Sequence, residues 1–431
     1  MNTNKINLIT LGCSKNLVDS ERVIKMFEKI GFSTSHNPQE ITGDIVIINT
    51  CGFIGDAKEE SINTILEYVH AKQNGHISKL YVMGCLSQRY REELSCEIPE
   101  VDKWYGKFDW EQIVSDISSK NNQISDFDRA ITTPSHYAYV KIAEGCNRFC
   151  AFCAIPLITG RYKSRSIESI LNEIKLLVSQ GVKEFNIIAQ DLSYYGIDLY
   201  GSQRLPQLID EIAQIKGVEW VRLHYAYPTQ FPLELLDVMA KHDNVCKYLD
   251  LALQHSSDIV LNNMKRHITH DETIKLVNLI REKVPGIHLR TTLMVGFPGE
   301  DDCEYNKLID FTKTMKFERM GAFSYCEEED TYAAKNYNDV ISSDTKESRL
   351  NNLMAIQENI SYEINQSKIG NIYKVIIDNE EDDFYIGRTE YDSPEVDQEV
   401  LIKKSSKLKI GNFYNVKITD ALAFDLIAEL V

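Results

Sequence analysis

Short apolar segments with the character of strands alternate with amphipathic segments of helical periodicity over the first 335 residues of the chain. Three strand–helix repeats fill about residues 1–130, and six more fill about residues 135–335. Strands separated by helices pair in parallel, and ligands bind beyond the carboxyl ends of such strands. Six repeats are too few to close an eight-stranded barrel. The alternation therefore predicts an α/β protein with an open parallel sheet followed by a partial (βα)6 barrel.

The pattern changes after residue 335. A helix is predicted at about 344–366, and the residues after it read as short strands separated by turns. Such a run favours a small antiparallel β-barrel. We therefore expect three domains, with boundaries at 1–130, 131–366 and 367–431.

Composition narrows the class of protein. The net charge of −17, from 47 Lys and Arg against 64 Asp and Glu, argues against non-specific nucleic-acid binding and favours a basic partner. The sequence contains no run of 18 apolar residues and no signal-peptide pattern at its start, so we expect a cytoplasmic protein without membrane contact. Its ten cysteines are then expected to bind metal or act in catalysis rather than form disulfides. A monomer is the default expectation.

The segment "EGCNRFCAFCAIP" places Cys146, Cys150 and Cys153 in a CxxxCxxC spacing, in the loop after the first barrel strand. A structural zinc site needs four ligands, and His136 would lie at the far end of the strand. A CxxC redox pair leaves Cys146 unexplained. A four-iron cluster held by three cysteines, with one iron open, fits the spacing best. The zinc, redox and plain buried-cysteine interpretations stay as alternatives.

Cysteines also follow the three predicted strands of the first domain. Cys13, Cys51 and Cys85 lie far apart in sequence but at equivalent strand ends. Because parallel strands end at one edge of a sheet, we expect the three thiols to converge there. Each could instead be a small residue under a helix N-terminus. Their shared position favours a second three-thiolate cluster.

These features together resemble the radical S-adenosylmethionine (SAM) superfamily, in which an aromatic residue, here Phe152, precedes the last cysteine of CxxxCxxC. The whole layout is similar to that of the methylthiotransferase family, whose terminal domain is the OB-like TRAM barrel. The resemblance covers essentially the entire chain. Its matching segments are "LGCSKNLVDSE", "INTCGFI", "YVMGCLSQRY", "EGCNRFCAFCAIP", "QDLSYYGIDLYG", "YLDLALQHSS", "TTLMVGFPGE" and "GRTEYDSPEVD".

The resemblance implies two 4Fe–4S clusters and two SAM molecules. The cluster on the CxxxCxxC cysteines would bind SAM and generate a 5′-deoxyadenosyl radical. The auxiliary cluster on the three strand-end cysteines would carry an exchangeable sulfur, which SAM methylates before its transfer. The scheme requires no side-chain general base, so no catalytic side chain is named.

The segment "LGCSKNLVDSE" resembles the branch of the family that modifies the β-carbon of one aspartate in small-subunit ribosomal protein S-twelve. The branch that acts on transfer RNA usually has Cys-x-Met-Asn at that place. Residues 368–431 contain 8 Lys and Arg against 13 Asp and Glu, which suits a basic protein better than the backbone of RNA. The implied partners are S-twelve, free or in the small subunit, and an electron donor such as flavodoxin or ferredoxin.

Two other functions stay open. One is methylthiolation of an adenosine in transfer RNA, which uses the same chemistry. The other is a non-catalytic iron–sulfur sensor or scaffold, which would hold clusters without cleaving SAM.

Candidate SAM contacts lie near the CxxxCxxC loop and the predicted strand ends. Gln190 and Asp191 close the second barrel strand, where members of the superfamily hold the methionine amino group. A polar loop, or for Arg161 a surface salt bridge, is the alternative at these positions. The full set of candidates is Phe152, Arg161, Gln190, Asp191, Gln254 and Thr291.

Overall fold

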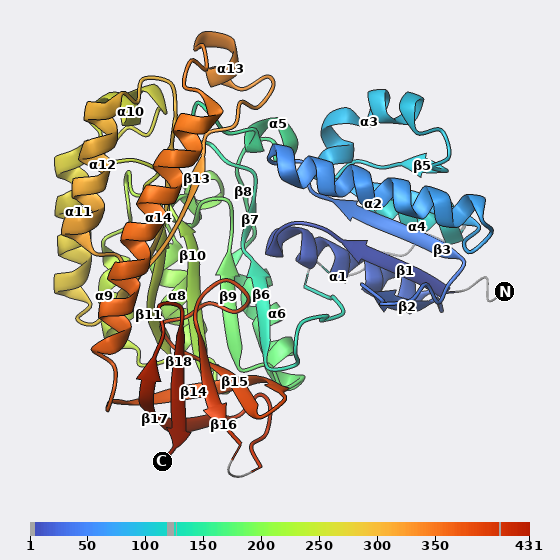
Figure 1. Cartoon of the computed structure of the whole chain (residues 1–431). Coiled ribbons are helices and arrows are strands. Elements are labelled where there is room, and N and C mark those ends of the chain that lie inside the picture. Colours follow the sequence, from blue (N-terminus) through green and yellow to red (C-terminus); the bar gives the residue numbers. More distant parts are fainter. Residues whose placement is uncertain (1–4, 119–124, 126, 405–406) are drawn as a thin grey trace.

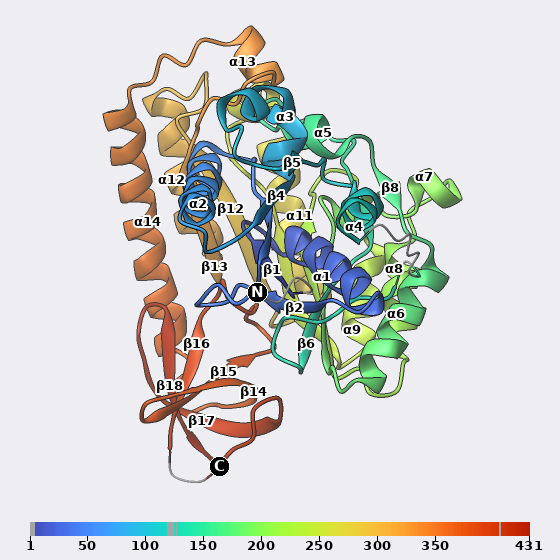
Figure 2. The same cartoon turned by 90° about the vertical axis from the view of Figure 1, so that its right-hand side faces the viewer.

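The chain forms three main sheets that follow one another in sequence. The computed structural model describes residues 5–118, 125, 127–404 and 407–431. Figure 1 shows the N-terminal domain in blue beside the central barrel, with the terminal strands in red below the barrel. Figure 2 shows the same three parts from the side on which the N-terminal domain lies in front.

The N-terminal sheet is parallel, in the order β2-β1-β3-β4-β5. Its central strands are buried on both faces, so Ile47 and Ile48 of β3 contribute to two different hydrophobic clusters. The short strands β2 and β5 and the helix α4 were not among the predicted repeats. The elements are β1 (Lys5–Thr10), α1 (Ser14–Lys29), β2 (Ser33–His36), β3 (Ile45–Thr50), α2 (Gly55–Gln73), β4 (Lys79–Gly84), α3 (Cys85–Glu97), β5 (Lys103–Trp104) and α4 (Trp110–Ser118).

The central sheet confirms the predicted partial barrel. Its six strands are all parallel, in the order β13-β12-β11-β10-β9-β6. Helices cover its outer surface and bury a continuous core. The strands are β6 (Tyr137–Lys141), β9 (Glu184–Ile188), β10 (Trp220–Ala226), β11 (Val245–Leu251), β12 (His288–Val295) and β13 (Arg319–Ser324). The main helices are α6 (Ile167–Ser179), α8 (Leu205–Ala213), α9 (Glu234–Lys241), α11 (His270–Lys283), α12 (Asp302–Met315) and α14 (Ser343–Gln366).

Shorter elements connect these units above the barrel. They are β7 (Ala143–Glu144), α5 (Ile155–Thr159), β8 (Lys163–Ser164), a 3-10 turn at Leu192–Tyr194, α7 (Ile197–Tyr200), α10 (Asp258–Asn263) and α13 (Tyr332–Asn336).

The terminal domain is a closed five-stranded barrel in the order β14-β15-β16-β18-β17. The barrel is confirmed, but the prediction that it is antiparallel is wrong for one pair, because β16 and β18 run parallel. A closed ring with an odd number of strands cannot alternate direction throughout, so one parallel pair is unavoidable. The strands are β14 (Ile372–Glu381), β15 (Phe384–Thr389), β16 (Glu399–Lys403), β17 (Phe413–Ala421) and β18 (Asp425–Leu430).

Buried ion pairs fasten this terminal barrel to the amino ends of the central strands. Glu184, the first residue of β9, is fully buried and bonds to Arg222 at 3.0 Å and to Arg388 at 2.8 Å. Arg388 also reaches Asp378 at 2.6 Å. Trp220 packs edge-to-face on Phe413 across the same junction. The terminal domain is thus docked by ion pairs that are largely buried.

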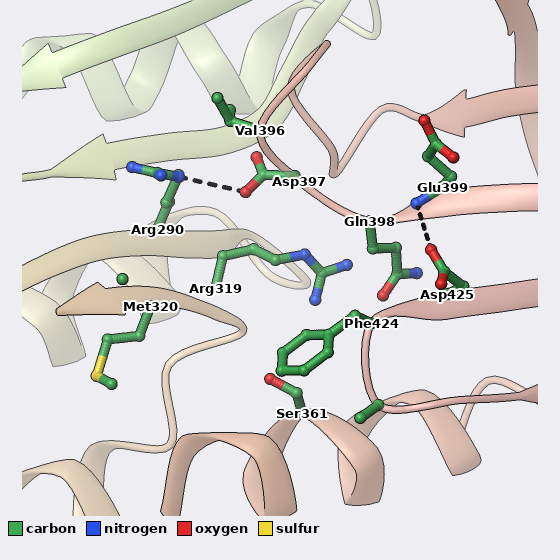
Figure 3. Close-up of a pocket in the computed structure, with 12 residues that line it drawn as sticks. Arg290, Arg319, Met320, Ser361, Val396, Asp397, Gln398, Glu399, Phe424 and Asp425 are labelled. Carbon is green, nitrogen blue, oxygen red and sulfur yellow. Dashed lines mark hydrogen bonds and ion pairs between the residues drawn. The ribbon is translucent and has the colours of Figure 1, made fainter. Parts of the chain in front are cut away.

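A cavity of about 340 Å³ lies at the side of this junction (Figure 3). Arg290 of β12 pairs with Asp397 there, and the backbone N–H of Glu399 contacts Asp425. No cysteine is among the described residues that line it. The cavity therefore lacks the ligands that the sequence predicts for an iron–sulfur centre.

Removing Arg388 is expected to destabilise the protein by about 3–5 kcal/mol, because it leaves the buried Glu184 with Arg222 as its one described cationic partner and takes the guanidinium away from Asp378. Denaturant unfolding followed by tryptophan fluorescence checks the Arg388→Ala variant, since Trp220 reports on the junction. The control is Lys374→Ala, whose partner Glu219 lies across the same junction but in solvent, at 3.5 Å. That change should cost about 0–1 kcal/mol. Equal losses for the two variants would contradict the prediction.

Buried ion pairs also join the N-terminal domain to the central barrel, among them Lys141 of β6 with Asp19 of α1. We call two other clusters of such pairs the latches. In the first, Arg129 bonds to Glu21 of α1 and, at 2.8 Å, to Glu173 of α6. In the second, Glu328, in the segment after β13, accepts from Arg89 of α3 at 2.9 Å. All five side chains of the latches are nearly buried. The latches fix the carboxyl edge of the N-terminal sheet against the open end of the barrel.

Candidate active site

The three predicted cluster cysteines of the first domain lie at or just beyond the carboxyl ends of strands β1, β3 and β4. Cys13 precedes α1, Cys51 follows β3 directly, and Cys85 begins α3. Glycines let these loops pack against each other. A Cβ on Gly12, whose φ is +86°, would lie 2.7 Å from the Cβ of Cys51, and one on Gly52 would lie within 2.9 Å of the Cys85 backbone. A side chain at either glycine would push the three strand ends apart.

Asn16 ties the same three loops together. Its side-chain amide donates to the carbonyl of Leu11 at 3.1 Å and to that of Thr50 at 3.0 Å. Its carbonyl oxygen accepts from Lys107 at 3.1 Å and from the Cys85 thiol at 3.5 Å. Asn16 is fully buried, so all these bonds form out of contact with water. One side chain therefore sets the relative positions of the strand ends that carry the cysteines.

The CxxxCxxC loop leaves the central barrel after β6. Gly145, with φ +74°, starts the turn, and a Cβ there would lie 2.2 Å from a backbone oxygen of Arg161. The sulfur of Cys150 accepts from the Arg266 guanidinium at 3.3 Å and lies 3.7 Å from the Tyr227 hydroxyl. Such contacts to a sulfur that ligates a metal fix the orientation of the sulfur and tune the properties of the bound metal.

One cavity of about 320 Å³ brings both sets of cysteines together. It lies between the N-terminal domain and the carboxyl ends of the barrel strands, where α1 packs on β6 and α3 on α5. None of the described residues that line it is an Asp or Glu. Its lining is Cys13, Lys15, Asn16, Cys51, Phe53, Cys85, Lys107, Cys146, Arg148, Cys150, Phe152, Cys153, Ile155, Ile158, Gln190, Tyr225, Ala226, Tyr227, Ala252, Gln254 and Arg266.

Burial sets the acidity of most of these thiols. It raises the pKa of Cys85 to about 11 and that of Cys146 to about 12. It also raises the pKa of Cys51 and of Cys153. A buried thiol in this state keeps its proton unless a metal replaces it. The donor set of soft sulfur ligands without carboxylates suits an iron–sulfur cluster.

Cys13 differs from the others. Desolvation by itself would raise its pKa, but the ammonium groups of Lys15 and Lys107, together with the backbone N–H groups of Asn16 and Lys15, outweigh it and lower the pKa. Arg148 and Arg266 add two more positive groups to the same cavity. Clusters with thiolate ligands are negative, so cations around the cavity offset the charge that such clusters bring. The residues present therefore fit two three-thiolate clusters.

Three of the six predicted SAM contacts line the cavity, namely Phe152, Gln190 and Gln254. Phe152 packs edge-to-face on Phe297, which fixes its ring. Gln254 adopts a φ of +73°, and its buried amide oxygen accepts no hydrogen bond from a described residue. That oxygen is open to a donor from a bound molecule.

The other three candidates are not among the described residues that line the cavity. The Asp191 carboxylate accepts from Arg148 at 2.6 Å and caps the following turn. The Arg161 guanidinium lies over the ring of Phe149, and the Thr291 hydroxyl donates to a backbone carbonyl of β11. Their roles toward SAM stay predictions, as do those of all six candidates.

Sequence reasoning missed the four cations of the cavity. Lys15 and Arg148 each lie two residues from a cysteine, in segments already identified by their motifs. Arg266 belongs to the "MKR" segment that follows α10. Lys107 follows the two-residue strand β5, and no sequence pattern indicates its place in the cavity.

Three protein-family models match successive parts of the chain. They are Uncharacterized protein family UPF0004 at residues 5–106, the Radical SAM superfamily at residues 140–312 and the TRAM domain at residues 369–431. The ribosomal protein uS12 methylthiotransferase RimO of Phocaeicola vulgatus is 59% identical over 100% of both chains. The chain belongs to the RimO family. RimO of Parabacteroides distasonis is 56% identical, again over 100% of both chains.

RimO of Cytophaga hutchinsonii is 47% identical over 99% of this chain and 98% of that one. These matches confirm the predicted radical SAM methylthiotransferase family and the branch within it. Membership of the radical SAM superfamily brings SAM and a 4Fe–4S cluster as cofactors. In the part of the chain that the structure describes, no helix is both long and apolar enough to span a bilayer.

Solved radical SAM enzymes share the fold. The methyltransferase TsrM of Kitasatospora setae, with cobalamin and a 4Fe–4S cluster bound, has a TM-score of 0.57 at 15% identity and covers 77% of each chain. The cobalamin-dependent enzyme OxsB has a TM-score of 0.53 at 14% identity, covering 82% of this chain and 56% of that one. At these identities the likeness concerns the fold alone.

Proposed function

We propose that the chain transfers a methylthio group to the β-carbon of an aspartate in ribosomal protein uS12 (S-twelve). The full-length identity to RimO relatives supports the substrate. The single structural observation that carries the proposal is that two cysteine triads from different domains line one cavity. Domain boundaries at 1–130, 131–366 and 367–431 are part of the same proposal.

We propose that the strand-end cysteines Cys13, Cys51 and Cys85 hold one 4Fe–4S cluster and that the CxxxCxxC cysteines hold the other. When bound, the two clusters and SAM supply the one-electron chemistry and the sulfur. The chain's own residues orient these groups. Asn16 fixes the first set of loops, and Arg266 supports Cys150.

The protein also keeps the reacting centre dry. Phe152, Ile155 and Ile158 give the cavity an apolar wall, and Gln190 and Gln254 offer polar groups toward SAM. Excluding water protects a reactive carbon centre from side reactions. We also propose that the protein is a cytoplasmic monomer and receives its electrons from a flavodoxin or ferredoxin.

Two alternatives are weaker. Transfer RNA as substrate would need a positive groove, whereas the terminal domain has more acidic than basic residues. A sensor or scaffold would need neither a cavity shared by both triads nor room beside them for a substrate.

Anaerobic incubation with SAM, a reductant and either uS12 or transfer RNA tests the proposal. We expect uS12 to gain the mass of one methylthio group on an aspartate, with formation of 5′-deoxyadenosine. Modification of transfer RNA alone would overturn the choice of substrate. Bound clusters without any 5′-deoxyadenosine would favour the sensor.

A further inference from the structure

The cavity between the two cysteine triads is lined by four cationic side chains, and two of them have carboxylate partners. Lys107 bonds to Asp19 at 2.6 Å, with both side chains almost fully buried. Arg148 bonds to Asp191 at 2.6 Å. These charges are neutralised by the protein itself. Lys107 and Arg148 therefore stabilise the walls of the cavity, and their ion pairs weaken any attraction for an anionic ligand.

The third cation, Arg266, is engaged in another way. One of its guanidinium nitrogens donates to the Cys150 sulfur at 3.3 Å, and another donates to the carbonyl of Ala252. The guanidinium carbon Cζ of Arg266 also lies 4.0 Å from the centroid of the Tyr227 ring. Arg266 therefore serves the CxxxCxxC side of the cavity.

Lys15 is the exception. The residue is only 6% exposed, and no described Asp or Glu lies within ion-pair distance of its ammonium group. Its contact is with the ring of Tyr225, 3.4 Å from the ring centroid. Tyr225 holds a φ of +64°, which an L-residue rarely adopts. The nearby Asp250 is already paired with Arg290.

A buried ammonium group without a carboxylate partner is costly, and a single cation–π contact offsets only part of that cost. The group therefore favours an anionic ligand that enters the cavity. Its position indicates which side of the cavity the anion would occupy, because Lys15 follows Cys13 by two residues in α1 and contacts Tyr225 at the end of β10. An anion bound there lies between the two domains.

We propose that Lys15 binds the side-chain carboxylate of the target aspartate and thereby selects an acidic residue over its amide. This inference rests on the proposed function. The β-carbon that reacts is bonded directly to this carboxylate, so an ion pair at the carboxylate also positions the carbon. Asp and Glu are absent from the described lining, so no carboxylate of the protein competes there for the ammonium group. Lys15 is then a specificity and positioning residue.

The test uses the cluster-loaded protein with SAM and no reductant, so that nothing turns over. The probes are two peptides that span the target aspartate of uS12, one natural and one with asparagine in its place. We expect the wild-type protein to bind the aspartate peptide about 100-fold more tightly, as for a desolvated charge pair. Lys15→Met should bring the two affinities together, and Lys15→Arg should keep most of the preference.

Lys175→Met, on the exposed face of α6, is the matched control and should leave the ratio of affinities unchanged. An unchanged ratio in Lys15→Met would overturn the inference. So would weaker SAM binding with the peptide ratio intact, which would assign Lys15 to the SAM carboxylate. Equal affinity of the wild-type protein for the aspartate and asparagine peptides would overturn the inference even before a variant is tested. Failure of the proposed function is distinct, because then neither peptide binds and reduction yields no methylthio product.

Discussion

Replacing Cys150 by alanine should abolish formation of 5′-deoxyadenosine from SAM, to below the limit of detection. Cys150 lies in the middle of the CxxxCxxC loop, and its sulfur is fixed by Arg266 and Tyr227. Two remaining thiolates cannot hold a cluster that needs three. The wild-type protein should contain about eight irons per chain, and Cys150→Ala about four, since each cluster has four. Analysis of 5′-deoxyadenosine after anaerobic reduction checks the loss of SAM cleavage, and iron determination checks the two iron contents.

Cys96→Ala is the control for this result. Cys96 is exposed on α3 and does not line the cavity. Its removal should leave both iron content and SAM cleavage at wild-type levels. Undiminished 5′-deoxyadenosine from Cys150→Ala would show that SAM is cleaved elsewhere and would refute the assignment of the loop.

Replacing Cys51 by alanine should abolish methylthio transfer to uS12 while leaving the cleavage of SAM intact. Cys51 lies in the other triad, on the N-terminal domain, and its loop packs directly against Gly12. The CxxxCxxC loop belongs to the central barrel and is left intact. We therefore expect SAM cleavage at close to the wild-type rate, about four irons per chain, and complete loss of methylthio transfer to uS12.

The comparison between the two variants is informative because each should lose one function and about half of the iron. Mass spectrometry of uS12 after reaction, with 5′-deoxyadenosine measured in the same sample, separates them. Methylthioaspartate formed by Cys51→Ala would rule out the strand-end triad as the source of the transferred sulfur. Loss of SAM cleavage in that variant would mean that the two centres depend on each other for assembly.

Much of the fold follows from local patterns in the chain. The helices and strands of a parallel α/β unit are set by periodicity, and strand ends meet at one edge because neighbouring strands run in the same direction. For this reason the common location of Cys13, Cys51 and Cys85 could be anticipated although they are separated by more than thirty residues each. The same logic places Phe152 in the loop beyond the carboxyl end of the first barrel strand, β6.

The features that the sequence did not predict depend on contacts between residues that are far apart in the chain. Arg388 and Glu184 meet although they lie 204 residues apart, and neither position has a local signal for pairing. Lys107 reaches the cavity from the turn after β5, a strand of two residues that is too short to show a period. Thr291 illustrates another limit. The sequence predicts Thr291 at the end of its strand, but β12 continues to Val295, so Thr291 lies in the middle of the strand and its hydroxyl bonds to the neighbouring backbone.

The latches at Arg129 and Glu328 have a consequence for what can be modified. Because they hold the two domains on either side of the cavity, its width is set before any substrate arrives. A space of about 320 Å³ has no room for a helix of about 10 Å diameter together with SAM. The recipient aspartate must be delivered on a slender protruding loop, so accessibility of that loop, rather than the bulk of the protein behind it, decides which partners can react.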